Sequence, residues 1–211
     1  WDLRYFHDRR SYSSSINNNI PLPSKVACNG PISMSAYKEH GYPKKDLIEV
    51  EALRYLYIND CSEKYFYNSK KIRLLVLGDY LEINAKKQLE TLQRAISTLN
   101  SEFLVSFKAH PACPINLSLY PDIKGETISD KLEILLPKFD VIFASSTTSA
   151  AVDGYCAGLA VITLLDGEQL NMSPLRDCEG TIFVENHFQL KDYLIKIINK
   201  KFKKKKEKLL L

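Results

Sequence analysis

The sequence is 211 residues long, which is enough for one large domain or for one domain plus part of another. Its composition is ordinary for a soluble globular protein, with 45% hydrophobic and 26% charged residues. The formal net charge is +4, and the lysine run at residues 200–208 exceeds that surplus by itself. The rest of the chain is therefore near neutral, which argues against a nucleic-acid-binding protein.

The cysteines are odd in number and widely spaced, and none forms a C-x-x-C pair that would suggest a zinc or redox site. They indicate reduced thiols and a cytoplasmic protein. No apolar run is long enough to span a membrane, and the start of the chain does not have the pattern of a signal peptide. The first residue is Trp1 rather than Met, which leaves open whether the chain is a fragment of a longer protein.

The first part of the chain predicts an irregular segment followed by a short α/β unit. Residues 1–24 combine aromatic, basic, serine and asparagine residues with two prolines, a composition that resists regular structure. Residues 26–28 and 47–53 then predict strands, with a helix at 32–40 that Gly41 ends. The polar and aromatic residues 59–71 indicate a domain boundary. We therefore predict that residues 25–70 are the end of a first domain and a linker.

The second part of the chain alternates strands and helices. Apolar runs predict strands at 72–77, 103–107, 141–144, 160–165 and 181–184. Helices are expected at 85–99, from residue 129, at 148–157 and at 188–202. This order predicts an α/β fold for residues 71–199, with a doubly wound parallel, Rossmann-like sheet. Residues 200–211 form a basic tail, either solvated or in contact with an anionic membrane surface.

The first candidate for chemistry is His110, which follows a predicted strand and precedes Pro111. Proline favours extended backbone in the residue before it, so the imidazole is expected at the carboxyl end of the strand. An imidazole there can donate to a phosphate oxygen or protonate a leaving phosphate. It can equally hydrogen-bond its own loop, and the dipeptide alone does not separate the two.

The second candidate is the run of five hydroxyl residues, Ser-Ser-Thr-Thr-Ser, at positions 145–149. It lies where a predicted strand turns into a predicted helix, and free amides together with hydroxyls make a binding site for an anion. Simple capping of the helix is the alternative. Because five hydroxyls exceed what a cap requires, we favour a phosphate site at Ser145, Ser146 and Thr147.

Further candidates follow other predicted strands of the same sheet. Gly78 and Asp79 come after the strand at 72–77, although they do not form a G-x-G-x-x-G sequence. Asp153 can reach ribose hydroxyls, or it can be a solvent-facing helical acid. A loop after the strand at 160–165 adds Asn171 and Ser173, and would form another wall of the same crevice.

The chain resembles the donor-binding half of glycosyltransferases with the two-domain GT-B fold. The segments WDLRYFHD at residues 1–8, ACNG at 27–30 and VEALRY at 50–55 resemble bacterial surface-carbohydrate (O-antigen) biosynthesis proteins. The HP dipeptide and the later Ser-Ser pair resemble two motifs of bacterial sialyltransferases. That resemblance implies that His110 contacts the nucleotide phosphate and acts as an acid toward it, while Ser145 and Ser146 hold the phosphate. CDP-glycerol glycerophosphotransferases are similar in both motifs, so the nucleotide stays open.

The resemblance implies a nucleotide-sugar-dependent glycosyltransferase of bacterial surface polysaccharide assembly, without a cofactor or metal ion. Its partners would be a nucleotide sugar and a glycan or lipid-linked acceptor, and it would act in the cytoplasm or at the inner face of the membrane. Residues 25–70 would end the acceptor-side domain, so the fragment by itself is expected to be inactive. Two alternatives remain open: a nucleotide-sugar epimerase or hydrolase of the same architecture, and a non-catalytic nucleotide-binding subunit.

Overall fold

The computed structural model of the chain describes residues 23–39, 41–51, 53–58, 71–100, 102–176 and 178–199. The predictions for residues 1–22, for the linker at 59–70 and for the basic tail at 200–211 lie outside these described residues. The chain divides into two compact units, one ending at Leu56 and the other beginning at Tyr57. Each unit is described by itself.

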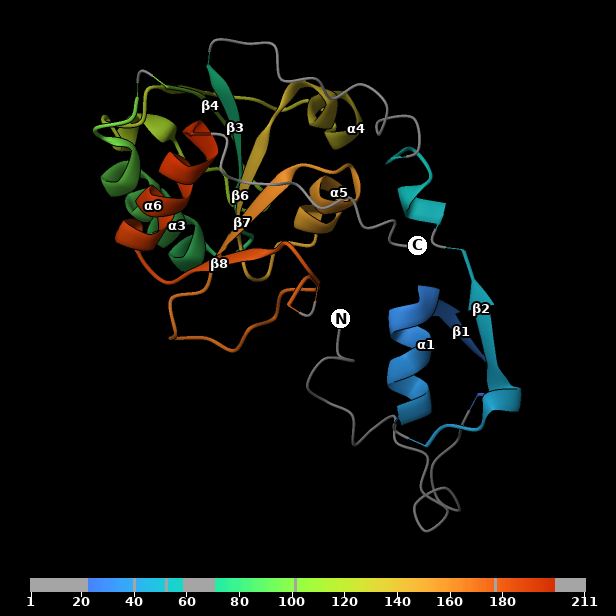
Figure 1. Cartoon of the computed structure of the whole chain (residues 1–211). Coiled ribbons are helices and arrows are strands. Elements are labelled where there is room, and N and C mark those ends of the chain that lie inside the picture. Colours follow the sequence, from blue (N-terminus) through green and yellow to red (C-terminus); the bar gives the residue numbers. More distant parts are fainter. Residues whose placement is uncertain are drawn as a thin grey trace. The chain divides into compact units, whose positions relative to one another are not determined.

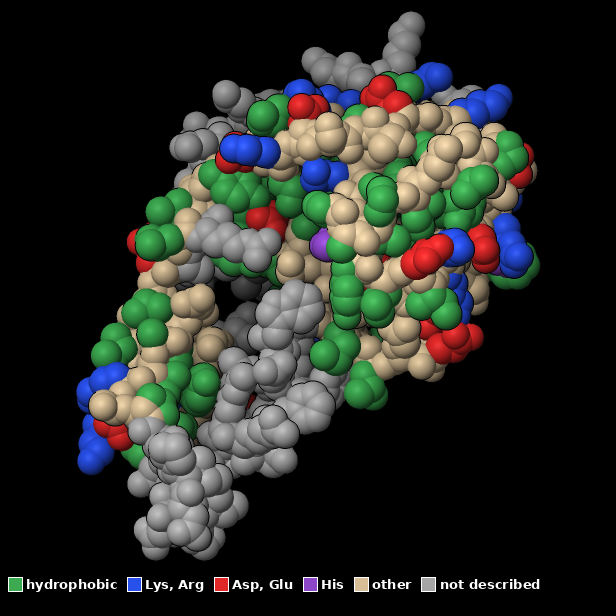
Figure 2. Space-filling view, turned by 180° about the vertical axis from the view of Figure 1, so that it is seen from behind, with side chains coloured by type: hydrophobic (Ala, Val, Ile, Leu, Met, Phe, Trp, Pro, Cys, Tyr) green, Lys and Arg blue, Asp and Glu red, His purple; other side chains and the backbone are tan. Residues whose placement is uncertain are grey.

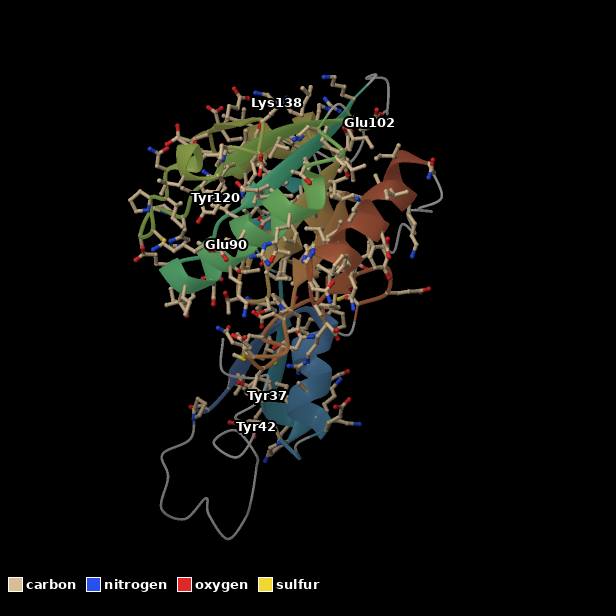
Figure 3. All side chains as sticks on the ribbon, turned by 90° about the vertical axis from the view of Figure 1, so that its left-hand side faces the viewer. Tyr37, Tyr42, Glu90, Glu102, Tyr120 and Lys138 are labelled. Carbon is tan, nitrogen blue, oxygen red and sulfur yellow. The ribbon has the colours of Figure 1, made fainter. Side chains whose placement is uncertain are left out.

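The smaller unit is a parallel pair of strands with one α-helix, and Figure 1 shows its elements. Its core contains Cys28, Tyr42 and Leu47. The ring of Tyr42 meets Tyr37 edge to face, with ring centroids 5.5 Å apart (Figure 3). The elements of this unit are β1 (Val26–Asn29), α1 (Gly30–Glu39), η2 (Lys44–Asp46), β2 (Leu47–Val50) and η3 (Leu53–Tyr55).

The strand predicted at 47–53 is wrong in its second half, because β2 ends at Val50 and a 3-10 helix follows at Leu53–Tyr55. The reason lies in the partner strand. Each β2 residue pairs with one residue of β1, and Val50 pairs with Asn29. The next residue, Gly30, has φ of 79° and starts α1, so the chain after Val50 has no strand beside it.

The larger unit is a six-stranded sheet in which every pair of neighbouring strands is parallel. The strand order is β5-β4-β3-β6-β7-β8. This confirms the predicted α/β, Rossmann-like fold. The strands are β3 (Ile72–Leu77), β4 (Phe103–Lys108), β5 (Gly125–Thr127), β6 (Val141–Ser145), β7 (Ala160–Leu164) and β8 (Ile182–Val184). The helices are α3 (Glu82–Ile96), α4 (Leu132–Leu135), α5 (Ala150–Cys156) and α6 (His187–Ile198), with η4 (Leu117–Leu119) and η5 (Leu136–Lys138).

The strand order reverses between β3 and β6. From β3 the chain moves outward to β4 and β5, and it then returns to β6 on the other side of β3 before reaching β7 and β8. In open α/β sheets, ligands bind at the carboxyl ends of the strands where the order reverses in this way. Here those ends are Leu77 and Ser145, which places the polar residues after them at one edge.

Helices cover both faces of this sheet (Figure 1). On one face, α3 and α6 pack on the strands through apolar residues that alternate along each strand, and this layer forms the main core. On the other face, α5 packs on β6 and β7. The helices and strands together bury nearly every residue of β3, β6 and β7. Continuous burial explains why these three strands have uninterrupted apolar sequences.

The outer side of the sheet differs from the sequence prediction in two ways. The strand β5 was not predicted, because the sequence Gly-Glu-Thr has no apolar run and all three residues are exposed. The helix predicted to start with a cap at residue 129 begins at Leu132, and Lys131 precedes it without a side-chain cap. It is only one turn long because Pro137 cannot continue an α-helix, and η5 takes its place.

The amino ends of β3 and β6 are joined by an ion pair. The Arg73 guanidinium donates to both carboxylate oxygens of Asp140, at 3.0 and 2.9 Å, and the Arg73 backbone amide donates to the same carboxylate at 2.9 Å. The Asp140 side chain is 5% exposed. This bidentate contact fixes the register of the two strands at the edge away from their carboxyl ends.

On the larger unit in Figure 2, lysine and arginine side chains lie near acidic ones, so both signs of charge occur on the side that the view shows. Among the described residues, none of the helices has the length and apolar character required to cross a bilayer.

Candidate functional site

Gly78 brings the end of β3 against the HP dipeptide. Its amide donates to the Lys108 carbonyl at 2.9 Å, which extends the pairing of β3 with β4 by one residue. A Cβ atom at position 78 would lie 3.2 Å from the His110 amide nitrogen and from the Phe107 ring. A glycine here therefore lets the backbone of His110 approach β3 closely.

His110 is exposed, and it starts a tight turn in which its carbonyl accepts from the Cys113 amide at 2.8 Å. Its Nδ1 accepts a hydrogen bond from the Ala112 amide at 3.2 Å, so the proton of the neutral imidazole lies on Nε2. The ring of Tyr80 lies edge-on to it, with centroids 6.2 Å apart. The imidazole is thus bonded to its own loop on one side and keeps a donor on the other. Pro111, also exposed, follows within the turn.

Asp79 is the centre of a buried polar cluster that joins β3 to the turn after β6. Only 1% of its surface is exposed. Its Oδ2 accepts hydrogen bonds from the hydroxyls of Ser145 and Thr147. Its Oδ1 accepts from the Leu81 amide at 2.8 Å. The structure therefore brings together three of the predicted site residues, but the carboxylate and the hydroxyls are bonded to each other.

The remaining residues of the hydroxyl run are arranged differently. Thr148 Oγ1 lies 2.8 Å from Ser145 Oγ. Ser146 is 6% exposed, and its hydroxyl makes no hydrogen bond to any residue in the described ranges. The helix that follows is shorter than predicted, because α5 spans Ala150–Cys156, and Ser149 precedes it without capping through its side chain. Simple side-chain capping therefore does not account for the run.

Asn84 and Gln88 of α3 also bond to the carboxyl end of the β3 and β6 pair, and neither was predicted as a site residue. Asn84 donates to Asp79 Oδ2 at 3.4 Å and accepts from Gln169 at 2.8 Å. Gln88 is fully buried, and its Nε2 donates to the carbonyls of Leu77 and Phe143, each at 3.1 Å. One signal was available: Gln88 occupies a position on the apolar face of α3, where a polar side chain needs a partner.

The sequence left open whether Asp153 is a solvent-facing helical acid, and the structure shows that it is not. It is 2% exposed, and its carboxylate accepts a hydrogen bond from the Tyr57 hydroxyl. Close behind it, Gly154 packs on β6: a Cβ atom there would lie 2.0 Å from Ile142 Cδ1. Burial, followed by the nearby Asp153 carboxylate, raises the pKa of the Cys156 thiol to about 12. This cysteine is therefore a weak nucleophile.

Asn171 and Ser173 form hydrogen bonds within their own loop. The Asn171 side chain accepts from the Ser173 amide at 3.1 Å, and Ser173 Oγ accepts from the Leu175 amide at 3.2 Å. Ser173 is 1% exposed. Their predicted contact with a ligand remains a prediction.

An ion-pair group holds the loop after β7 against α3. Lys87 Nζ lies 2.6 Å from the Asp166 carboxylate and 2.7 Å from that of Glu168. Hydrogen bonds to these two carboxylates raise the pKa of Lys87. For Asp166, burial raises the pKa, but the bonds from Lys87 and from the Glu168 amide outweigh burial and leave the pKa lowered. The rim of the site on the β7 side is thereby fixed to the helix that carries Asn84 and Gln88.

The cluster does not have the donor set of a metal site: in the described part of the chain, no three His, Cys, Asp or Glu residues gather as metal ligands would. A hollow of about 290 Å³ lies at the outer side of the sheet and contains none of the predicted site residues. Burial raises the pKa of Tyr120 in its wall, with the Glu90 carboxylate of α3 the next cause (Figure 3). The hollow is lined by Asn116, Leu117, Ser118, Tyr120, Pro121, Ile123, Gly125 and Thr127.

No protein-family model matches this sequence, and no curated protein does. Solved structures do match. UDP-GlcNAc 2-epimerase from Methanocaldococcus jannaschii is 16% identical with a TM-score of 0.60, and the match covers 92% of this chain and 63% of that protein. MurG from Acinetobacter baumannii is 14% identical with a TM-score of 0.53, over 85% of this chain and 66% of that one.

A third match is the glycotransferase of kitacinnamycin, 14% identical with a TM-score of 0.53, over 84% of this chain and 47% of that one. The chain thus spans about 63% of the epimerase that it matches and less of the glycotransferase. At these identities the likeness shows the fold alone. That fold is the α/β, Rossmann-like architecture of GT-B proteins.

Proposed function

We propose that this chain is the donor-binding half of a nucleotide-sugar-dependent glycosyltransferase. One observation carries the proposal. The HP dipeptide and the hydroxyl run come to the carboxyl ends of β4 and β6, on either side of Gly78 and Asp79, where the strand order reverses. This is the edge at which open α/β sheets bind nucleotides.

In the proposed complex, the donor phosphate lies between His110 and the turn at 145–149. The Nε2 proton of His110 is the group that donates to a phosphate oxygen, because Nδ1 accepts from the Ala112 amide. As the bond to the sugar breaks, negative charge grows on the leaving phosphate, and a donor aimed at it lowers the barrier. Protein donors supply this stabilisation in our proposal, and a metal ion has no part in it. Asp153, Asn171 and Ser173 are proposed to meet the rest of the donor.

The acceptor and the catalytic base belong, in this proposal, to an acceptor-side domain of which residues 25–70 form the end. The resemblance to O-antigen biosynthesis proteins favours a glycan or lipid-linked acceptor of bacterial surface polysaccharide. It also favours a place of action in the cytoplasm, at the inner face of the membrane.

The test is a calorimetric panel of CMP, CDP, UDP, GDP and ADP against the 211-residue chain, with thermal midpoints measured in parallel. A ligand that binds the folded state raises the midpoint. We expect at least one nucleotide to bind, and His110→Ala and Ser146→Ala to weaken it. His187→Ala is the matched control, because His187 lies in α6 and outside the cluster. If none of the five nucleotides bound or shifted the midpoint, the donor site would be refuted.

An epimerase or hydrolase of nucleotide sugars is the second candidate, and the likeness in fold to the M. jannaschii UDP-GlcNAc 2-epimerase favours it. The two are separated by incubating the intact protein with the nucleotide sugar that it binds and without any acceptor. An epimerase or hydrolase consumes the donor under these conditions. A transferase needs the acceptor, so full donor recovery counts against the epimerase or hydrolase.

A further inference from the structure

Asp79 is a buried carboxylate with neutral partners only. Its 1% exposure and its position at the reversal of strand order place a negative charge beneath the proposed phosphate site. Burying a carboxylate is costly unless hydrogen bonds satisfy its oxygens. The bonds come from the Leu81 amide, the Asn84 side chain and the hydroxyls of Ser145 and Thr147. No lysine, arginine or histidine of the described residues forms an ion pair with it.

The direction of these hydrogen bonds fixes where the hydroxyl protons point. A hydroxyl has one proton, and a carboxylate can only accept. Ser145 and Thr147 therefore direct their protons at Asp79. Thr148 Oγ1 lies 2.8 Å from Ser145 Oγ, and it must be the donor in that pair because the Ser145 proton is already engaged. Three of the five hydroxyls in the run thus donate into the protein.

Ser146 differs from its neighbour Ser145 in the hydrogen bonding of its hydroxyl. The two residues are adjacent and equally exposed, at 6% each. The Ser146 hydroxyl, however, makes no hydrogen bond to any residue in the described ranges. Its proton is therefore available to a ligand.

We propose that Asp79 is a positioning residue of the phosphate site. Its carboxylate accepts the hydrogen bonds of Ser145 and Thr147, which leaves the Ser146 hydroxyl to donate to the phosphate. The charge of Asp79 itself weakens the binding of that phosphate. The inference rests on the proposed function, since it assigns roles within the same site. It changes the roles expected from the resemblance, in which Ser145 and Ser146 act as a pair.

Asp79→Asn tests this role, because a positioning residue and a merely structural residue predict opposite changes in the affinity for an anion. The asparagine keeps the shape of the side chain and an oxygen for the Leu81 amide, but its amide group donates where the carboxylate accepted. The hydroxyls of Ser145 and Thr147 then accept hydrogen bonds from this amide group. Each hydroxyl is left free to donate its own hydrogen bond to the ligand. The substitution also removes a negative charge close to the phosphate. Both effects favour tighter binding of an anion.

The first experiment is calorimetry of UDP with the 211-residue chain and with Asp79→Asn. We expect UDP to bind the variant at least about threefold more tightly, since a like charge has been removed. A merely structural aspartate predicts the opposite, because its loss loosens the turn. Unchanged or weaker binding of UDP by a folded Asp79→Asn would overturn the proposal.

The second experiment needs no ligand and compares thermal midpoints. Ser145→Ala removes a donor from buried Asp79, and we expect it to lower the midpoint by several degrees, and by clearly less in the Asp79→Asn background. Ser106→Ala is the matched control. Ser106 is 7% exposed and donates to Glu126 at 3.3 Å in another part of the sheet, so its effect should be equal in both backgrounds. Equal effects of Ser145→Ala in both backgrounds would refute the coupling.

If Asp79→Asn does not fold, the comparison of Ser145→Ala with Ser146→Ala in the native background decides. Only the first should lower the midpoint substantially, because only Ser145 bonds to Asp79. Similar losses in both would count against the proposal. If UDP and the other nucleotides bind no variant, the proposed function fails, while the midpoints still test the role of Asp79.

Discussion

The two ends of the β3 and β6 pair are each joined through an aspartate whose side chain is largely covered, and the two aspartates have different partners. At the amino end, Asp140 meets the Arg73 guanidinium in a bidentate ion pair. At the carboxyl end, Asp79 meets hydroxyls and amides. Each contact connects the same two strands.

The charges distinguish the two ends, and this difference supports our proposal that a ligand binds at the carboxyl end. The Arg73 guanidinium offsets the charge of Asp140, and the pair joins the two strands. The partners of Asp79 are neutral, so its charge still acts on whatever binds above it. Our proposed phosphate site therefore lies at the end where the strands are connected without an ion pair.

The largest expected effect comes from breaking the amino end. Asp140→Ala removes both hydrogen bonds to the guanidinium and one to the Arg73 amide. We expect a loss of about 2–4 kcal/mol in the free energy of unfolding, at the lower end because the Arg73 side chain is 31% exposed. Urea denaturation measures it. The exposed pair of Glu82 and Lys86 is the control, since Glu82→Gln should cost far less. A similar small loss in Asp140→Ala would show that this end is not held by the pair.

The second largest effect is expected from overpacking at Gly154, where α5 contacts β6. In Gly154→Ala the new Cβ atom would overlap Ile142 Cδ1, which is fully buried, and we expect a loss of about 1–3 kcal/mol. Ile142→Val deletes that Cδ1 atom, so the double variant should regain most of the loss. Additive losses in urea denaturation of the single and double variants would contradict the proposed close approach of α5 to β6.

A smaller effect is expected at the carboxyl end itself. Gln88→Leu removes the amide that donates to the carbonyls of Leu77 and Phe143. The variant should lose about 1–2 kcal/mol, because two buried carbonyls each lose a donor while one unpaired oxygen is also removed. Hydrogen exchange should show faster opening at the carboxyl ends of β3 and β6 than at Arg73. Uniform destabilisation of both ends would argue that Gln88 is an ordinary core residue.

The smallest effect on stability is expected from the ion pairs of Lys87 with Asp166 and Glu168, at the rim of the proposed site. The folded-state pKa of Asp166 lies below its ordinary value of 3.8, so its stabilisation is present at higher pH and is lost as the pH falls through the folded-state pKa. The pKa of Lys87 lies above its ordinary value of 10.5, so its contribution is lost as the pH rises through the raised value. Lys87→Met should cost at most about 1 kcal/mol near neutral pH, since the lysine is partly exposed.

Stability against pH, measured for the wild type and for Lys87→Met, checks this prediction. The variant should show a flatter profile at both extremes, and Lys86→Met serves as the control on the exposed side of the same helix. If the two lysine variants had the same profile, the loop after β7 would not depend on the Lys87 group.

The fold was largely predictable because its central strands are buried on both faces. Continuous apolar runs marked β3, β6 and β7, and the alternation with helices indicated parallel pairing. The outer strand β5 left no such mark, since its burial is minimal and its pairing with β4 depends on the chain around it. Helix α4 was overestimated because the effect of Pro137 outweighed the apolar pattern before it.

The grouping of the candidate residues at one edge of the sheet was predictable, and the hydrogen bonds among them were not. Strand-end polar residues identified His110, Asp79 and the hydroxyl run, because parallel strands end at a common edge. The bonds from Ser145 and Thr147 to Asp79 required knowing that β6 lies directly beside β3, in a register that pairs Leu77 with Ala144. No local pattern specifies an adjacency between segments more than sixty residues apart.

The outer strand β5 also affects how copies of this protein behave in solution. Open strand edges can recruit a strand from another chain and start aggregation. β5 offers only three residues for such pairing, and Glu126 accepts a hydrogen bond from Ser106 of β4, which draws its side chain back over the sheet. At Gly125 a larger residue would clash with the Val105 carbonyl, 2.7 Å from the position of a Cβ atom. A short, charged edge with an obligatory glycine disfavours sheet extension from this side.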